Sequence, residues 1–285
     1  MQLSTVICNY NTRDELARAL QSLLDHAGTL AHEIIVVDNA SHDGSAEMVR
    51  QRFPTVRLIE SGENRWFSGG NNLGMRAAQG DYVLILNPDT IILPGALQTL
   101  VAYLNEHPAA GAVTARMTFA DGRLQRNCSQ FITYADLLLG YTFLGVLLRA
   151  WRNQRRAVMW YSDWDRESTR AVDVAPGSCI MARRAILNQI DHFDERLKLF
   201  FTDDELCQKI AGSGAALHYV AEATIIHDEH ASLNQVPRLT QRVYFEDLLT
   251  YTRLYIGSLQ AGLLAGLLVP TRAAMNLKRL LRRKD

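Results

Sequence analysis

Short apolar runs alternate with amphipathic stretches along the first 118 residues. Strand-like runs cover residues 3–9, 33–38, 56–61, 82–86 and 112–118. Between them, apolar residues recur every three or four positions, a spacing typical of helices, over residues 14–24, 45–52, 70–78 and 94–104. Strands that alternate with helices in this order predict an α/β fold with a doubly wound, mostly parallel sheet and helices on both faces.

The pattern loosens after residue 118. Asp121-Gly122 predicts a hairpin turn. The apolar stretch 137–148, the arginines after it and the aromatic-acidic stretch 160–165 predict a loop region rather than scaffold. We expect order to resume over residues 172–182, followed by a helix from about Arg184, an ordered segment over 200–211 and a strand over 218–226, and the last fifty residues are predicted to be helical.

Composition limits the classes of protein. The chain has 285 residues, of which 48% are apolar and 21% charged, enough to bury a large α/β core. Residues 271–285 hold six of the 30 basic residues and one of the 30 acidic residues, which leaves 24 basic and 29 acidic residues upstream. An acidic body argues against a nucleic-acid partner. The four cysteines are far apart, which predicts neither a zinc cluster nor disulfides and indicates a reducing, cytoplasmic compartment.

Polar side chains follow three of the first four predicted strands. The first strand is followed by Tyr10 and Asn11, the second ends at Asp38, and the fourth is followed by Asn87 and Asp89. In a parallel sheet these ends share one edge, where open α/β sheets bind ligands, so we expect the side chains to converge. A carboxylate there can accept a hydrogen bond from a nucleotide or bind a divalent cation. Asn, Pro and Asp are also ordinary turn residues, so a plain turn remains open at each strand end.

An aromatic and glycine-rich segment precedes the third predicted helix. Trp66 and Phe67 could stack on a base or sugar, or lie buried under the sheet edge. Gly69 and Gly70 permit a close backbone approach, and the amino end of a helix that begins there favours anions. The segment does not have the GxGxxG pattern, so a dinucleotide cofactor is only weakly supported.

Acidic residues and a histidine in the second half carry candidate chemistry. The three adjacent acids at 203–205 can supply a general base whose pKa is raised by mutual repulsion, or they can simply favour the start of a helix. His227 could complete a metal site with Asp89, bind zinc together with His230, or lie at the surface without a ligand.

Several segments resemble, in their order along the chain, the motifs of the family-2 inverting glycosyltransferases of the GT-A fold. Within this family the resemblance is strongest to the bacterial branch that includes rhamnosyltransferases. The segments are residues 6–11, 36–45, 87–89, 173–184, 202–206 and His227. The resemblance covers roughly residues 3–255. It implies a nucleotide-sugar-binding half over 1–118, an acceptor-binding and catalytic half of the same domain over 119–235, and a helical C-terminal extension over 236–285.

The resemblance also implies roles for individual residues. Asp203 matches the family's base, with Asp204 as its rival, while Asp89 and His227 would bind Mg²⁺ or Mn²⁺. Gly177 and Arg183 would lie on the acceptor side. Asp38 would contact the nucleotide base, as one of a set of donor-binding residues: Tyr10, Asn11, Asp38, Trp66, Asn72 and Asn87.

Three departures from the family pattern change this expectation. Asn87 replaces the first Asp of the DxD motif, which leaves one carboxylate there for the metal. Thr202 and Glu205 replace the Glu and the final Asp of the segment that carries the base. Trp66 stands where relatives tend to have Gly, which alters the expected shape of the donor pocket.

The resulting hypothesis is an inverting transfer of a sugar, with rhamnose as the candidate, from a dTDP- or UDP-sugar to a glycan or lipid-linked acceptor in cell-surface polysaccharide synthesis. Two other classes remain open: a non-catalytic glycan-binding or scaffold subunit, and a nucleotidyltransferase. The apolar stretch 256–269 and the basic tail after it predict an amphipathic helix at the inner face of the cell membrane; a soluble terminal helix or an oligomer contact remains open.

Overall fold

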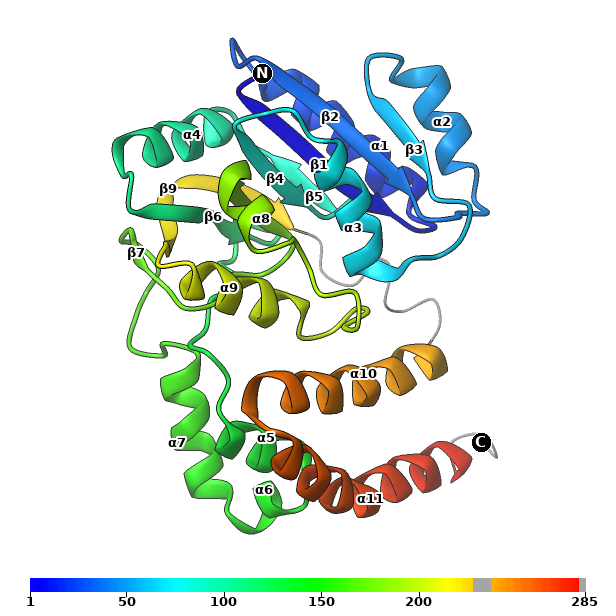
Figure 1. The fold of residues 1–285 in the computed structure, drawn as a ribbon, viewed down its shortest axis with the longest axis vertical. Coiled ribbons are helices and arrows are strands. Elements are labelled where there is room, and N and C mark those ends of the chain that lie inside the picture. Colours follow the sequence, from blue (N-terminus) through cyan, green and yellow to red (C-terminus); the bar gives the residue numbers. More distant parts are fainter. Residues whose placement is uncertain (228–236, 282–285) are drawn as a thin grey trace.

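The molecule consists of a sheet flanked by helices and, beside it, a separate layer of helices (Figure 1). The computed structural model describes residues 1–227 and 237–281. His230 and Ser232, and with them the zinc alternative that pairs His227 with His230, lie outside the described residues, as do residues 282–285 of the basic tail.

Within the described residues, one nine-stranded sheet has the order β3-β2-β1-β4-β8-β6-β9-β5, and β7 pairs with β9. Its strands are β1 (Leu3–Asn9), β2 (His32–Asp38), β3 (Arg57–Glu60), β4 (Tyr82–Leu86), β5 (Thr90–Ile92), β6 (Ala110–Thr118), β7 (Arg170–Ala171), β8 (Cys179–Arg183) and β9 (Ala216–His227). The first four strands in sequence are parallel, and β8 is inserted antiparallel between β4 and β6. The predicted α/β class is confirmed.

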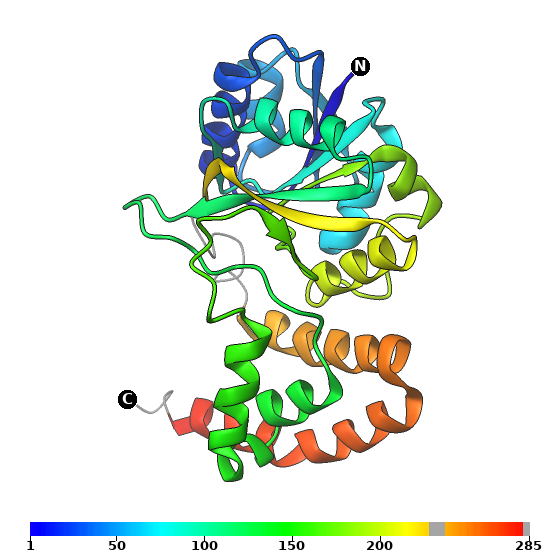
Figure 2. The ribbon, with the colours of Figure 1, turned by 90° about the vertical axis from the view of Figure 1, so that its left-hand side faces the viewer.

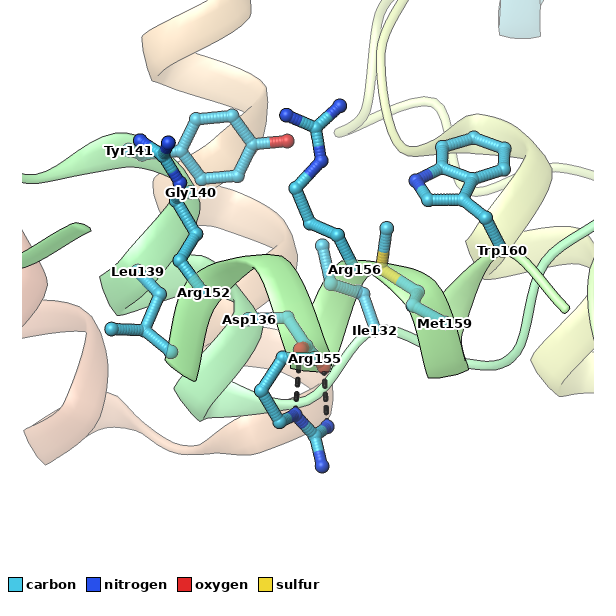
Figure 3. A pocket seen from close by; sticks show the side chains of 10 residues that line it. All are labelled: Ile132, Asp136, Leu139, Gly140, Tyr141, Arg152, Arg155, Arg156, Met159 and Trp160. Atoms are coloured by element: carbon cyan, nitrogen blue, oxygen red, sulfur yellow. Dashed lines mark hydrogen bonds and ion pairs between the residues drawn. The ribbon is translucent and has the colours of Figure 1, made fainter. Parts of the chain in front are cut away.

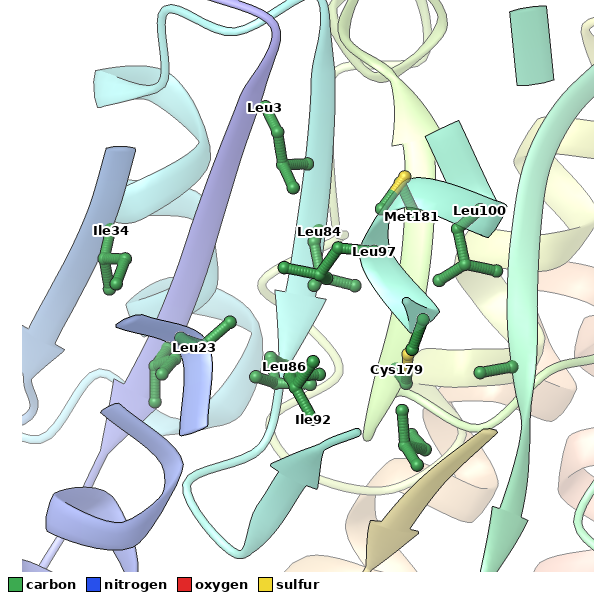
Figure 4. Close-up of a cluster of buried hydrophobic side chains, with 14 of the residues drawn as sticks. Leu3, Leu23, Ile34, Leu84, Leu86, Ile92, Leu97, Leu100, Cys179 and Met181 are labelled. Atoms are coloured by element: carbon green, nitrogen blue, oxygen red, sulfur yellow. The ribbon is translucent and has the colours of Figure 1, made fainter. Parts of the chain in front are cut away.

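Alternate side chains of the central strands enter two hydrophobic cores, one on each face of the sheet. Leu84 and Leu86 pack under α1 (Arg13–His26), α2 (Ser45–Arg52) and α4 (Ala96–Glu106), as Figure 4 shows for part of this core. Val83 and Ile85 point the other way and pack under α3 (Trp66–Ala77), α8 (Arg184–Gln189) and α9 (Thr202–Gly212). Because the side-chain period of a strand is two, a fully apolar strand buries both faces, as the sequence predicted.

Helix α3 begins at Trp66, earlier than the predicted start at Gly70. A Cβ atom at Gly70 or Gly74 would clash with Cys8 or Val6 of β1, so these glycines allow the helix to lie close against the sheet. The first free N–H groups of the helix, those of Phe67 and Ser68, donate to the carbonyl of Lys198. The expectation of an anion site at this helix end was therefore wrong, because the chain itself caps the helix.

The middle of the chain is helical, so the predicted loop region was wrong there. It contains α5 (Tyr134–Tyr141), α6 (Leu144–Leu147) and α7 (Arg149–Met159). A reciprocal capping box of Thr133 and Asp136 starts α5. Regular structure resumes near the end of residues 172–182, where β8 begins at Cys179. The turn at Asp121-Gly122 is confirmed by a Gly122 φ of +83° and by the flanking Thr118–Leu124 bridge.

The C-terminal extension is helical, as predicted, in the part that the structure describes. It consists of α10 (Pro237–Tyr251), a π-helical turn (Thr252–Ile256) and α11 (Ser258–Leu281). A third hydrophobic core joins it to α5 through Leu137, Phe245, Leu248, Leu264 and Leu268, and Figure 2 shows these helices as one layer apart from the sheet. Across residues 1–227 and 237–281, no helix combines the length and the apolar character needed to cross a bilayer.

Candidate active site

The carboxyl ends of β1, β2 and β4 meet at one edge of the sheet. Asn9 lies opposite Asp38 in the β1–β2 pair, and Ile7 lies opposite Leu86 in the β1–β4 pair. The polar residues that follow these strands therefore share this edge, as the alternating pattern predicted.

Asp38 is held in a fixed orientation by its neighbours. Its carboxylate is 4% exposed and accepts hydrogen bonds from the Asn9 side chain at 3.2 Å and from the Ser41 backbone N–H at 3.0 Å. Asn11 has a positive φ of 53° and accepts from the His42 backbone N–H at 2.7 Å. Tyr10 lies between them along the chain and is partly exposed.

Trp66 sits at the start of α3 in a left-handed backbone conformation, with a φ of 61°. Asn39 fixes this conformation: its amide donates to the Trp66 carbonyl at 3.0 Å and to Asn64 at 3.0 Å. The ammonium group of Lys198 lies 5.7 Å from the centroid of the indole ring. The ring is partly exposed, and a bulky residue at positive φ is uncommon and is found at functional sites more often than elsewhere.

Asn87 to Thr90 form a tight turn that connects β4 to β5. The Thr90 backbone N–H donates to the Asn87 carbonyl at 3.2 Å, and the Asn87 N–H donates to the Ser178 carbonyl at 3.1 Å. Thr90 lies opposite His227 in the β5–β9 pair. The turn interpretation and the ligand interpretation are thus compatible, because the turn brings Asp89 to the end of β9.

Two acceptor atoms face each other at this point. Asp89 Oδ1 lies 3.4 Å from His227 Nε2, and both atoms are buried without a hydrogen-bond partner. On the other side of the ring, His227 Nδ1 lies 3.3 Å from Gln125 Oε1, and the Gln125 amide donates to the His227 carbonyl at 2.6 Å. A proton on Nδ1 leaves a lone pair on Nε2 that points at the carboxylate, which is the arrangement of a histidine metal ligand.

The pair fits a divalent cation that is shared with a substrate. The described residues contain no cluster of three or more His, Cys, Asp or Glu that could hold a metal alone. Mg²⁺ and Mn²⁺ in phosphate-transfer sites commonly take one or two protein ligands and complete their coordination with phosphate oxygens and water. Asp89 and His227 would supply the protein ligands.

Asp203 lies in the first turn of α9 and touches Gly177. Its carboxylate accepts a hydrogen bond from the Gly177 backbone N–H, and a Cβ atom at Gly177 would lie 2.5 Å from Asp203 Oδ1. Glycine is therefore required for this approach. Burial raises the pKa of Asp203, while the hydrogen bonds from Gly177 and Thr202 and the nearby His227 lower it, with a net rise.

Asp204 turns away from Asp203, toward the layer of helices. It accepts a hydrogen bond from the Ile132 backbone N–H, and burial together with the charge of Asp203 raises the pKa of Asp204 to about 7. Its charge also raises the pKa of Tyr141 and Tyr251, which lie on α5 and α10. The two adjacent acids thus face different surroundings. Asp203 faces the sheet edge, where His227 lies, and Asp204 faces the helical layer.

Two predicted site residues lie away from this edge. Arg183 is opposite Tyr82, at the far end of the β4–β8 pair, and its guanidinium donates to the carbonyls of Ala110 and Leu104. Asn72 is fully buried and exchanges hydrogen bonds with the Phe193 backbone at 2.9 and 3.0 Å. We leave both residues out of the site that we propose below.

Glu205 has a structural environment. It is fully buried, pairs with Lys209 at 3.1 Å and accepts from the Tyr255 hydroxyl at 3.2 Å. These contacts attach α9 to the C-terminal helices.

Sequence reasoning missed Gln125 and Asp247. Gln125 sits in an irregular segment with no pattern that marks it. Asp247 is 1% exposed and accepts three backbone N–H groups, from Lys198 at 3.1 Å, Leu199 at 2.9 Å and Phe200 at 2.9 Å. The sequence did contain a signal for Asp247. It lies between Val243 and Tyr251 on the apolar side of a predicted helix, where a buried acid needs hydrogen-bond partners.

The sheet with its polar carboxyl edge, the acidic turn and the helical cover define a glycosyltransferase of the GT-A fold. The model of the family described as glycosyl transferase family 2 matches residues 4–191, and the chain belongs to this family. It is a glycosyltransferase of this family.

Curated relatives align along most of the chain. The N-acetylglucosaminyl-diphospho-decaprenol L-rhamnosyltransferase of Mycobacterium tuberculosis is 28% identical over 250 residues, which cover 82% of this chain and 78% of the relative. The rhamnosyltransferase WbbL of Escherichia coli is 24% identical over 233 residues, which cover 79% and 83% of the two chains.

Solved structures share the fold. S. aureus TarS in complex with UDP-GlcNAc has a TM-score of 0.57 at 17% identity, over 93% of this chain and 70% of that one. GalNAc-T7 with UDP, GalNAc and Mn²⁺ has a TM-score of 0.62 at 14% identity, over 90% and 48%.

The environment of Asp204 predicts a pH-dependent stability. Because the folded pKa of this carboxyl is about 7, against an ordinary value of 3.8, its ionisation destabilises the fold increasingly as pH rises from the ordinary to the folded value, and the full penalty is present above the folded value. Asp204→Asn should therefore raise the free energy of unfolding at pH 8. We expect roughly 1–2 kcal/mol, less than the full shift because the side chain is partly exposed.

Urea unfolding at several pH values measures this difference, which should shrink as pH falls and vanish by about pH 3, where Asp204 is protonated in both the folded and the unfolded chain. The exposed carboxylate Asp163 supplies the control, and Asp163→Asn should change little at any pH. An Asp204→Asn variant that is no more stable than wild type at pH 8 would contradict the assigned environment.

Proposed function

We propose that the protein catalyses an inverting sugar transfer in which Asp203 is the general base. The observation that carries this proposal is the placement of Asp203 at the sheet edge, against Gly177 and within electrostatic range of His227. Asp203 takes the proton of the acceptor hydroxyl, the hydroxyl oxygen bonds to the anomeric carbon, and the bond from that carbon to the diphosphate breaks on the opposite face. The products are the glycosylated acceptor and a nucleoside diphosphate.

The donor nucleotide lies along the carboxyl ends of β1 and β2 in this proposal. Asp38 and Asn11 bind the base, Trp66 covers the sugar or base, and Tyr10 and Asn87 complete the wall. The orientation of Asp38 by Asn9 and Ser41 supports this role, because a preoriented carboxylate loses little entropy when it accepts a base N–H.

Asp89 and His227 hold Mg²⁺ or Mn²⁺ in the proposed enzyme. Their facing acceptor atoms, 3.4 Å apart, support this assignment. When bound, the cation neutralises negative charge on the departing diphosphate. Gln125 orients the His227 ring through its contact with Nδ1.

The named relatives support a rhamnosyl donor, a dTDP- or UDP-linked sugar and a lipid-linked glycan acceptor. In this proposal the enzyme acts on that acceptor at the inner, cytoplasmic face of the membrane. Exposed apolar side chains on α6 and α11 support that location: Val146, Leu147, Leu259, Leu263 and Val269 are 56% to 74% exposed. Both helices lie at the end of the molecule farthest from the sheet in Figures 1 and 2.

The charge around this apolar end suits an anionic lipid surface. Residues 137–162 contain four arginines and no carboxylate, and residues 258–281 likewise contain basic residues without an acid. The inner face of α11 is occupied by protein, since Leu264 and Leu268 are fully buried. Membrane contact would thus use the outer face of a packed helix, so removing residues after 255 would damage the third core as well.

Asp203→Asn is expected to lower kcat by 10²–10⁴-fold while the affinity for the nucleotide sugar is retained, because the amide cannot accept the proton. Asp204→Asn is the matched control and should keep kcat within about tenfold of wild type. The readouts are nucleoside diphosphate release, the anomeric configuration of the product, and donor binding by calorimetry. If Asp204→Asn lowers kcat by this amount and Asp203→Asn does not, the base is Asp204.

The same assay separates the other classes of protein. Release of pyrophosphate from a sugar phosphate and a nucleoside triphosphate would indicate a nucleotidyltransferase. Failure to release nucleoside diphosphate from any donor would indicate a binding or scaffold subunit.

Removal of a metal ligand should abolish Mn²⁺-dependent donor binding. Asp89→Asn and His227→Gln are each expected to lower the affinity for Mn²⁺ by more than 100-fold, because loss of a residue that only supports a ligand typically costs roughly 10–100-fold. Calorimetry with UDP present measures this affinity. Gln125→Ala should fall within that 10–100-fold range and recover kcat at saturating Mn²⁺. Unchanged Mn²⁺ affinity in both ligand variants would exclude this site.

The membrane contact is tested by flotation with vesicles that contain phosphatidylglycerol. Leu147→Ser with Leu263→Ser should reduce the floating fraction of the full-length protein at least by half, because about 1.5–3 kcal/mol is lost per apolar side chain that no longer inserts. Leu24→Ser, which alters an exposed leucine on α1, is the control. Equal flotation of the three proteins would refute the contact.

A further inference from the structure

A cavity of about 230 Å³ lies between α5 and α7, outside the site described above. Figure 3 shows its lining, in which α7 contributes arginines and α5 contributes Asp136 and Tyr141. Met159 and Trp160 close it at the end of α7. None of these side chains has a part in the mechanism proposed so far.

The cavity carries an excess of positive charge. Arg155 donates to both oxygens of Asp136, at 2.9 and 2.8 Å, so the one carboxylate in the lining is already paired. Arg152 and Arg156 also line the cavity and have no carboxylate partner there. The Nε atom of Arg152 is buried without a hydrogen-bond partner. A buried donor without a partner is costly and marks a place that a ligand would complete.

The two unpaired arginines can act together. They are four residues apart on α7, so they project from the same side of the helix. Guanidinium groups offer planar pairs of N–H donors that match phosphate oxygens. Tyr141 and Trp160 also line the cavity (Figure 3), and their rings can stack on a sugar ring.

The cavity shares a wall with the catalytic turn. Ile132 lines it and donates its backbone N–H to Asp204. Tyr141 also lines it, and its ring lies edge-on to Phe201, the residue before α9, at a centroid distance of 6.3 Å. The cavity is therefore on the Asp204 side of the acids, away from the Asp89–His227 pair that faces the donor diphosphate.

We propose that this cavity binds the diphosphate of a lipid-linked acceptor through Arg152 and Arg156. The proposal rests on the sugar transfer proposed above and names the group by which its acceptor is held. The apolar end of the molecule begins at α6, which directly precedes α7 in the chain, so a lipid tail can remain in the membrane while the diphosphate reaches the arginines. The sugar attached to that diphosphate then lies toward the first turn of α9, which carries Asp203 and Asp204.

Arginines on an exposed helix can also be mere surface charge, but α7 has the wrong orientation for that. It has no fully buried residue, and Trp151 and Val158 on its outer side are 48% and 51% exposed. Arg152 is half-buried and therefore less exposed than these apolar residues, whereas Arg156 is exposed at the mouth of the cavity that it lines. A helix that only solvated its charge would expose Arg152 as well and bury Trp151.

Inorganic pyrophosphate is the probe for the first test, with full-length protein in EDTA so that no cation occupies the Asp89–His227 pair. Calorimetry should show one bound pyrophosphate in wild type and at least a tenfold weaker Kd in Arg152→Gln with Arg156→Gln, on the order of the loss of a charge-assisted hydrogen bond. Arg149→Gln, an exposed charge on the same helix outside the cavity, should leave Kd unchanged. No binding to wild type, or equal binding to the double variant, would overturn the proposal.

A second test compares two acceptors that carry the same sugar, one on a short polyprenyl diphosphate and one on a neutral alkyl chain. The double variant should raise KM at least tenfold for the diphosphate acceptor only, with kcat and the donor KM retained. An equal change for both acceptors would show a structural role and refute the proposal. The pyrophosphate measurement needs no turnover, so its outcome is independent of whether Asp203 is the base.

Discussion

The carboxylate of Asp247 ties the two parts of the molecule together at the catalytic turn. It reaches from α10 to three consecutive backbone N–H groups of the segment that leads into α9. Each of these groups would cost about 1–3 kcal/mol if it were buried without a partner. The same segment caps α3 through the Lys198 carbonyl and ends at Phe201, which has a positive φ of 59°. A strained residue at this point persists only because its surroundings hold it, and it sets the direction in which Asp203 and Asp204 leave the helix.

The donor side could be predicted from sequence far better than the acceptor side. Asp38 and Asp89 lie at the ends of short apolar strands, and the parallel alternation alone requires these ends to share an edge. The acids at 203–205 were predicted as a cluster. The difference between the environments of Asp203 and Asp204 depends on Ile132, Gly177 and His227, which come close to these acids only in the folded chain. The cores on both faces of the sheet followed from the same alternation. Gly70 makes the close backbone approach that was expected of it, although its partner Cys8 and the contact of Gly74 with Val6 have no local signal.

The middle helices α5, α6 and α7 escaped prediction for a related physical reason. The stretch 137–148 is apolar enough to need a partner, and that partner, α10 and α11, lies more than 90 residues further along the chain. A short helix such as α5 is marginal by itself and forms because Leu137 packs against Phe245 and Leu264. The capping pair Thr133 and Asp136 was visible, but a cap without a visible core does not distinguish a helix from a turn.

In the proposed enzyme, the two diphosphates bind on opposite sides of the Asp203 carboxylate. In the function we propose, the leaving diphosphate is handled by Asp89 and His227 at the sheet, and the acceptor diphosphate by Arg152 and Arg156 in the helical layer. Asp203 must be ionised between them to accept a proton, which favours a place where neither diphosphate touches it. Asp204, whose pKa is near 7, lies closer to the acceptor side, and its partial neutrality reduces the repulsion that a second full charge would exert there on an anionic acceptor.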